Sequence, residues 1–372
     1  MLLHATAGVC TDPGIVESVA AIGSMLSDQA RSQPALLRAA LHPSLALGGA
    51  VSHILLSALG NPDDRADQLF RTAASSAGSA RRELPPYGLL EKLWISEIWG
   101  NKVPDDEWDR VLAASCLAGT PDLVGGSRED AYAVTHALMY VTDFGARRRA
   151  MPRPNPELMS DIEALLAITL ERQDYDLVGE LLMTWPFLGV QWSTPALFAF
   201  RLLTRVEDHV GLLPGGTTDA QTLRALSGER RRAYAIGTAY HTAFAMGMLC
   251  AASLRSDREP SSDAPVFVGG DTGAEPPARI QGDEEPVEVV LGDLTDAARD
   301  ALSPFLLDLA VARDIRNRAY GELARRLARA RSAGEPASPL QMQAVGLLDR
   351  LPMAVNISTP HTEVVSATSQ PE

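Results

Sequence analysis

Four apolar stretches of the sequence end in a bulky residue followed by glycine. The four pairs are Leu59-Gly60, Trp99-Gly100, Phe144-Gly145 and Leu188-Gly189, at spacings of about 40 to 45 residues. Glycine directly after a helix often adopts the left-handed conformation that ends it, and a spacing of this length holds two helices and two short connections. The pattern therefore predicts helical hairpins, each of which buries its apolar face against its neighbours.

The composition agrees with an all-α chain, because apolar residues make up 46% and aromatic residues only 5%, with Ala and Leu dominating. Such a composition favours helices over strands. We expect the hairpins to close into an α/α toroid or barrel, with an open helical-repeat array as the alternative. The first helix is expected to begin near residue 14, and the predicted inner helices are 44–59, 86–99, 127–144, 175–188 and 229–254.

The chain divides into four predicted parts. Residues 1–254 form the helical-hairpin domain, and residues 255–293, rich in Pro, Gly, Asp and Glu, form an acidic linker or lid. Residues 294–352 form C-terminal helices that pack on the main domain, and residues 353–372 form a disordered tail. In a closed ring, the helix expected at 295–333 packs against the N-terminal helices and so completes the ring.

Charge and cysteine content limit the compartment and the partners. The net charge of −14 argues against a nucleic acid or an anionic membrane as a partner. Three widely spaced cysteines without a CxxC pair, together with an N-terminus that lacks a secretion signal, indicate a reducing cytoplasm. Residues 233–254 carry no formal charge and are long enough to span a bilayer. Their polar side chains predict a buried central helix instead.

The helix predicted at 127–144 carries a row of polar and sulfur-containing side chains on one face. At helical spacing this face presents Tyr132, Thr135, His136, Met139, Tyr140 and Asp143. Two interpretations stay open. The row is either a hydrogen-bonded polar core that fixes helix packing, or the wall of a cavity with acid–base groups.

Other predicted inner helices add isolated polar residues. His53, His136 and Glu180 lie seven, nine and nine residues before their terminal glycines, so neighbouring helices would present them at one level. The predicted catalytic residues are His136, Tyr140, Asp143, His241 and Glu180. The predicted substrate-binding residues are His53, Trp94, Tyr132, Thr135, Met139, Tyr234 and Thr238.

Established motifs for metals and nucleotides are missing from the sequence. It contains no G-x-G-x-x-G after a strand, no P-loop, no H-E-x-x-H and no G-x-S-x-G. Asp63-Asp64-Arg65-Ala66-Asp67 matches a DDxxD metal motif but follows Asn61-Pro62, where helix capping is the better interpretation. A zinc site from Cys116, Cys250 and a histidine is an open but disfavoured alternative. We therefore expect neither a metal nor a cofactor.

The segment Thr135 to Gly145, with Tyr240-His241-Thr242 downstream, resembles a set of actinobacterial all-helical proteins. The resemblance implies a role in natural-product pathways, including pathways that modify ribosomally made peptides, and assigns no catalytic residue. We expect a lyase, isomerase or cyclase that acts on a small-molecule or peptide substrate. A partner protein of the same pathway is a further candidate partner. The alternative is a non-catalytic helical-repeat protein that holds a peptide or a partner protein.

Overall fold

The computed structural model describes residues 1–76, 83–254, 258–260, 296–334 and 336–358, and all regular secondary structure in them is helical. The predicted all-α class is confirmed. The first nine α-helices are α1 (Leu2–Val9), α2 (Pro13–Ala30), α3 (Gln33–Leu41), α4 (Ala46–Ala58), α5 (Asp64–Ala74), α6 (Pro86–Ile98), α7 (Asp105–Ala113), α8 (Arg128–Thr142) and α9 (Asn155–Glu171). The later helices are α10 (Tyr175–Leu182), α11 (Thr184–Leu188), α12 (Thr194–Val210), α13 (Ala220–Ala225), α14 (Gly228–Ser253), α16 (Asp296–Arg316), α17 (Tyr320–Ser332) and α18 (Pro339–Ser358).

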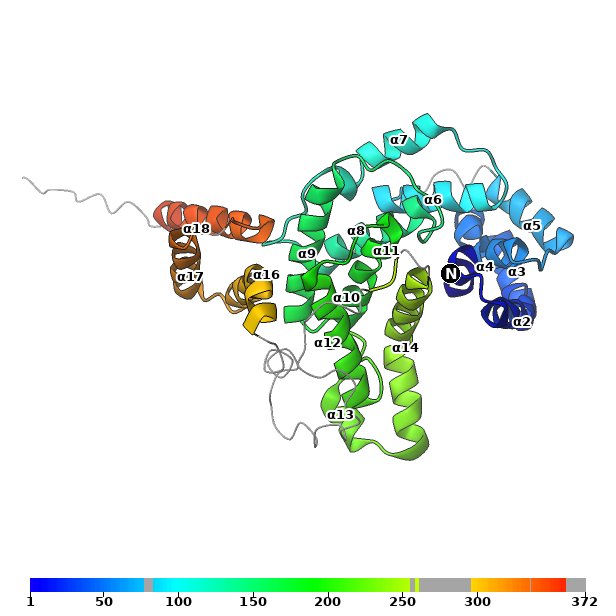
Figure 1. The fold of residues 1–372 in the computed structure, drawn as a ribbon. Coiled ribbons are helices and arrows are strands. Elements are labelled where there is room, and N and C mark those ends of the chain that lie inside the picture. Colours follow the sequence, from blue (N-terminus) through cyan, green and yellow to red (C-terminus); the bar gives the residue numbers. More distant parts are fainter. Residues whose placement is uncertain (77–82, 255–257, 261–295, 335, 359–372) are drawn as a thin grey trace, which may run out of the picture.

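Seven helices contact one another in a closed circuit (Figure 1). Helix α4 packs against α6, α6 against α8, α8 against α10 and α10 against α14. Helix α1 then packs against α14 and α2, and α2 packs against α4. A second set of helices pairs with this circuit, because α5 packs on α4, α7 on α6, and both α9 and α12 on α10. The circuit contains α4, α6, α8, α10 and α14, which lie in the segments predicted as inner helices.

The helix that closes the circuit is not the predicted one. The expectation that residues 295–333 pack against the N-terminal helices is wrong, because α16 packs against α9, α12, α17 and α18, well away from them (Figure 1). Helix α1, which the sequence analysis left out, takes that place. It has eight residues and no side-chain cap at its N-terminus, so it carries few of the signals that mark a helix.

The four glycine positions have the predicted conformation. The φ angles of Gly60, Gly100, Gly145 and Gly189 are 88°, 85°, 85° and 62°. After α4, the Asn61 N–H donates to the Leu56 carbonyl at 2.9 Å, and the corresponding bond after α6 runs from Asn101 to Ser96 at 2.9 Å. These six-to-one bonds define the Schellman ending, in which a left-handed residue lets the chain satisfy the last carbonyls of a helix.

Several helix boundaries differ from the prediction. The helix expected at 175–188 divides at Met183 into α10 and α11, and the helix expected at 295–333 divides at Arg318, whose φ is 56°. Helix α18 continues past Pro352 to Ser358, so part of the predicted disordered tail is helical. The rest of that tail and most of the predicted linker fall outside the described residues. Within the linker, Arg258 is buried and donates to the Gly145 carbonyl at 2.7 Å.

The prediction that residues 233–254 form a buried central helix is wrong. Helix α14 buries a narrow face against α10 and α1, while Ile236, Tyr240 and Phe244 on the opposite face are each more than half exposed. Small residues on the buried side, such as Ala245, allow α14 to pack closely against its neighbours through that one face. In the described part of the chain, no single helix is both long and apolar enough to cross a membrane. Helix α3 and the segment 43–58 meet those criteria only together, across a bend of 114°.

Candidate functional site

The main candidate site is a group of polar side chains where α8, α10 and α14 meet, here called the α8–α10–α14 cluster. It consists of Arg128, Tyr132, Thr135, His136, Asp174, Asp176, Glu180 and His241. Local sequence fixes its two main helices. Ser127 and Asp130 form a capping box that starts α8, and the Asp174 side chain accepts from the Leu177 N–H to start α10.

A carboxyl, a hydroxyl and an imidazole meet in the buried part of the cluster. The Thr135 hydroxyl donates to Glu180 Oε2 at 2.6 Å, and His136 Nδ1 lies 3.6 Å from the same oxygen. Glu180 is 2% exposed and His136 is 9% exposed. The Tyr132 ring stacks on the imidazole with centroids 3.6 Å apart. Residues 132, 135 and 136 come together as the sequence predicts, and Glu180 joins them from α10.

One ring nitrogen of His136 is held by the backbone. His136 Nδ1 lies 3.1 Å from the carbonyl oxygen of Tyr132, one turn earlier in α8. Because a carbonyl can only accept, this contact assigns the proton to Nδ1 and leaves a lone pair on Nε2. An imidazole held in this tautomer can accept a proton at Nε2.

The outer part of the cluster is an ion-pair network. His241 Nδ1 lies 2.7 Å from Asp176 Oδ1, so α14 is joined to α10. Arg128 donates through Nε to Asp174 Oδ2 at 2.7 Å and through Nη2 to Asp176 Oδ2 at 3.0 Å. The His241 side chain is 53% exposed, which opens this end of the cluster to solvent.

Burial controls the ionisation of the inner groups. Burial raises the pKa of Glu180 to about 7; the Thr135 hydrogen bond opposes the rise and the charge of Asp176 adds to it. Burial lowers the pKa of His136 to about 4 and raises the pKa of Tyr132 to about 12. Burial also raises the pKa of Tyr140, which shares a hydrogen bond with Glu91. The imidazole and both phenols are therefore uncharged at neutral pH.

Asp143 belongs to a different group of residues from the one predicted. Its Oδ1 accepts from His4 Nε2 at 2.9 Å and from Trp94 Nε1 at 2.7 Å, and Arg147 Nε lies 3.5 Å from Oδ2. Burial opposes the ionisation of Asp143, but the bonds from His4 and Trp94 lower its pKa. Asp143 has a φ of 49°, so the chain has left the helical path there and its carboxylate turns toward α1 and α6.

His53 lies outside the cluster, in a third group of polar residues. It is fully buried and stacks on Phe70, Arg31 Nε donates to its Nδ1 at 3.0 Å, and Asp67 lies 3.5 Å away. Burial and then the charge of Arg31 lower its pKa. These contacts join α2, α4 and α5. Asp63, the first residue of the DDxxD segment, caps α5 as the sequence indicates.

The remaining predicted binding residues serve packing. Met139 is 2% exposed in the core. The Tyr234 hydroxyl accepts from the Asp219 N–H at 3.0 Å, and Thr238 Oγ bonds to Thr218 Oγ at 3.1 Å. Tyr234 and Thr238 therefore hold the turn before α13, and their hydrogen bonds do not reach the inner part of the cluster.

Sequence reasoning missed several residues that the contacts bring into these groups. Among them are His4, Arg128, Asp174 and Asp176. Asp176 could have been found, because it precedes Glu180 by four residues and shares its helix face. Arg128 and His4 reach their partners across 46 and 139 residues of chain, and neither spacing follows from helical periodicity.

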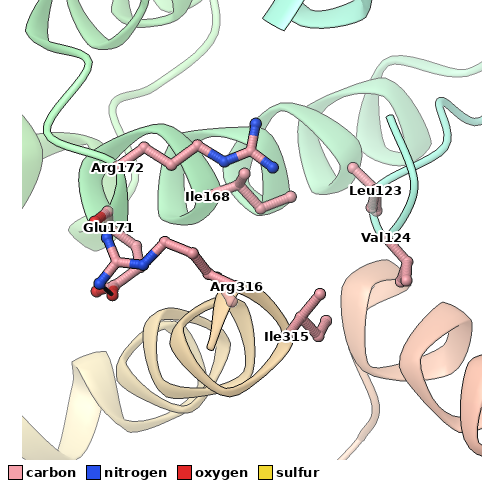
Figure 2. Close-up of a pocket in the computed structure, with 8 residues that line it drawn as sticks. Leu123, Val124, Ile168, Glu171, Arg172, Ile315 and Arg316 are labelled. Carbon is pink, nitrogen blue, oxygen red and sulfur yellow. Dashed lines mark hydrogen bonds and ion pairs between the residues drawn. The ribbon is translucent and has the colours of Figure 1, made fainter. Parts of the chain in front are cut away.

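A pocket between α9 and α16 is a poor candidate for a substrate site. Figure 2 shows Glu171 facing Arg316 across it, with Ile168 and Ile315 beside them. Glu171 Oε1 lies 2.8 Å from Arg316 Nη2 and 3.2 Å from Arg313 Nε. The volume is about 60 Å³, which holds only a few water molecules.

The cysteines do not form a metal site with histidine. All three are free, and one lies on each of α14, the turn at residues 116–118 and the segment after α1. Among the described residues, Asp176, Glu180 and His241 form the group of potential metal ligands whose ligand atoms lie close enough together to hold an ion. These three residues fall within the α8–α10–α14 cluster.

Residues 4–251 match the family model described as a domain of unknown function (DUF6895). The chain belongs to the DUF6895 family. The matched range begins within α1 and ends within α14. It therefore covers nearly all of the helix circuit and every residue of the cluster, and it leaves out α16 to α18. Comparisons with curated proteins and with solved structures find no match.

Proposed function

We propose that this chain is an enzyme that exchanges a proton with a small-molecule or peptide substrate at the α8–α10–α14 cluster. The observation that carries the proposal is the placement of His136. His136 Nδ1 donates to the Tyr132 carbonyl, and the Tyr132 ring stacks on the imidazole. In this tautomer the lone pair of Nε2 is available to accept a proton from a substrate. A lyase, isomerase or cyclase that needs no redox chemistry can work with such a group.

The neighbouring groups have defined parts in this proposal. Glu180, which accepts from the Thr135 hydroxyl, approaches the ring from the α10 side, and the exposed His241 marks the side from which a substrate approaches. Tyr140 lies on the same face of α8, with its ring centroid 6.0 Å from that of His136. The resemblance noted in the sequence supports a substrate from a natural-product pathway, including a ribosomally made peptide.

The test compares metabolite profiles in the organism that carries the gene. Strains with His136→Asn, with a deletion of the gene and with the exposed-residue control His42→Asn are compared by untargeted mass spectrometry. We expect His136→Asn to reproduce the deletion profile, with an accumulated substrate and a lost product, while the protein keeps its circular dichroism spectrum. A wild-type profile for a folded His136→Asn protein would contradict the proposal.

A binding protein without chemistry is the second candidate, and exposed apolar side chains favour it. They lie on α2, α3 and α14; Met25 is 79% exposed, Leu41 71% and Ile236 59%. Contiguous exposed apolar surface commonly marks a contact surface, and Ile236, Tyr240 and Phe244 follow one another at four-residue spacing along α14. In the metabolite experiment, this function predicts a phenotype for the deletion strain and none for His136→Asn.

A further inference from the structure

Asp176, Glu180 and His241 bring three ligand atoms to one point at the edge of the cluster. One ligand atom from each lies within 4.8 Å of the other two. Asp176 and Glu180 are four residues apart on α10 and so share a face, and α14 supplies His241. Both carboxylates are buried, whereas His241 is exposed.

The spacing suits a first-row transition metal. Ligand atoms about 2.0 to 2.2 Å from a tetrahedral Zn²⁺ lie about 3.3 to 3.6 Å apart. The contact between Asp176 Oδ1 and His241 Nδ1, at 2.7 Å, is already shorter than that. The exposed side chain of His241 has the freedom to adjust, and solvent on that side can supply further ligands.

Other residues hold the outer atoms of these ligands. Thr135 donates to Glu180 Oε2, and Arg128 donates to Asp176 Oδ2. The remaining oxygens face other partners: Oδ1 of Asp176 already contacts His241 Nδ1 at 2.7 Å, and Oε1 of Glu180 is the oxygen that Thr135 does not bind. Hydrogen bonds of this kind orient ligands in metal sites.

The local charge also favours a cation. Asp174, Asp176 and Glu180 bring three carboxyl groups together, and Arg128 contributes one guanidinium, which pairs with the two aspartates. Two buried carboxyls at one point are costly without a cation between them. A divalent ion placed among Asp176, Glu180 and His241 would compensate for this cost.

We infer that Asp176, Glu180 and His241 form a binding site for a divalent transition-metal ion such as Zn²⁺ or Mn²⁺. The two carboxylate oxygens and His241 Nδ1 are the ligands, with water on the solvent side. When the ion binds, the Nδ1 proton shared with Asp176 Oδ1 is released, and the neutral ring keeps its proton on Nε2. The site adjoins the proposed substrate position at His136, so a bound ion could hold an oxygen atom of a substrate there. The inference concerns binding of the ion and does not depend on the proposed reaction.

Calorimetric titration tests the site with ZnCl₂ and MnCl₂ on full-length, chelator-treated protein. We expect one ion per chain. We expect His241→Gln to weaken the binding by more than about tenfold, since loss of an outer-shell partner alone commonly costs 10- to 100-fold. The control His42→Gln, also an exposed histidine, should bind as the wild type does.

Two results would overturn the inference: no saturable binding of either ion, or equal affinity for the wild type and His241→Gln. Asp176→Asn is the second variant, expected to lose binding as well, but it also breaks the Arg128 pair. If Asp176→Asn does not fold, the affinity of His241→Gln alone decides the test. Ion binding together with a wild-type metabolite profile for His136→Asn would support the metal site and reject the proposed reaction. No ion binding together with a deletion-like profile for His136→Asn would reject the metal site and support the proposed reaction.

Discussion

Replacing Asp308 by asparagine is expected to stabilise this protein at neutral pH. Asp308 is a buried residue of α16, and its Oδ1 accepts from Ser338 Oγ and Gln341 Nε2, both at 2.7 Å. Burial raises the pKa of Asp308 to about 6 against the effect of these two bonds, and the nearby Glu163 adds to the rise. The ordinary pKa of this group is 3.8.

The sign of the change in stability with pH follows from the difference in proton binding between the folded and unfolded states. A raised pKa means that the folded state holds the proton more tightly than the unfolded state. This contribution to stability is fully present below about pH 3.8 and is lost as the pH rises through about 6. At 1.36 kcal/mol per pKa unit, the loss is about 3 kcal/mol. Asparagine stays neutral and its amide oxygen can accept the same two bonds, so Asp308→Asn should avoid this loss.

Urea unfolding followed by circular dichroism measures the effect. We expect the two proteins to have similar free energies of unfolding near about pH 4, and the variant to be more stable by about 3 kcal/mol near about pH 8. Asp300→Asn, at an exposed position of the same helix, is the control and should change stability by less than about 0.5 kcal/mol. A difference between variant and wild type that does not depend on pH would refute the reasoning.

Four further variants can be measured by the same urea unfolding. Arg318→Gly should raise the free energy of unfolding by about 0.5 to 1 kcal/mol, because Arg318 has a φ of 56°, and Gly100→Ala, at a φ of 85°, should lower it by about 1 to 2 kcal/mol. Equal effects of the two changes would contradict this. Asp143→Ala removes the acceptor of the buried Trp94 indole N–H and should cost about 1 to 3 kcal/mol, so an unchanged midpoint would argue against that hydrogen bond. Deleting residues 1–10 uncovers parts of α14 and α2 and should cost more than about 3 kcal/mol, a prediction that a wild-type midpoint would exclude.

The features of the fold that depend on neighbouring residues could be predicted from the sequence. Gly60 and Gly100 mark helix ends because a left-handed residue is required at that point of the chain. The same geometry at Gln173 and Arg318, with φ of 54° and 56°, carries no glycine signal. The helix division at Arg318 was therefore missed. Closure by α1 depends on contacts between distant segments, which periodicity does not encode.

The candidate site also combines features that the local sequence predicts with features that depend on distant contacts. Tyr132, Thr135 and His136 could be placed together, because one helix turn fixes their spacing. Asp143 continues that spacing, but the helix ends before it, at Thr142, and the left-handed turn directs its carboxylate to His4 and Trp94. The exposure of α14 could not be predicted either, because a long uncharged stretch such as residues 233–253 is predicted to be buried whether or not another element covers it.

The position of α1 in the circuit has a consequence for synthesis of the chain. About 220 residues separate Val9, the end of α1, from Gly228, the start of α14. At a translation rate of 5 to 20 residues per second, the ribosome needs roughly 10 to 45 s to make that length. During this interval the apolar segment Leu2–Val9 lacks its α14 partner, and we expect a chaperone to bind it. A slow codon between residues 9 and 228 would lengthen this exposure.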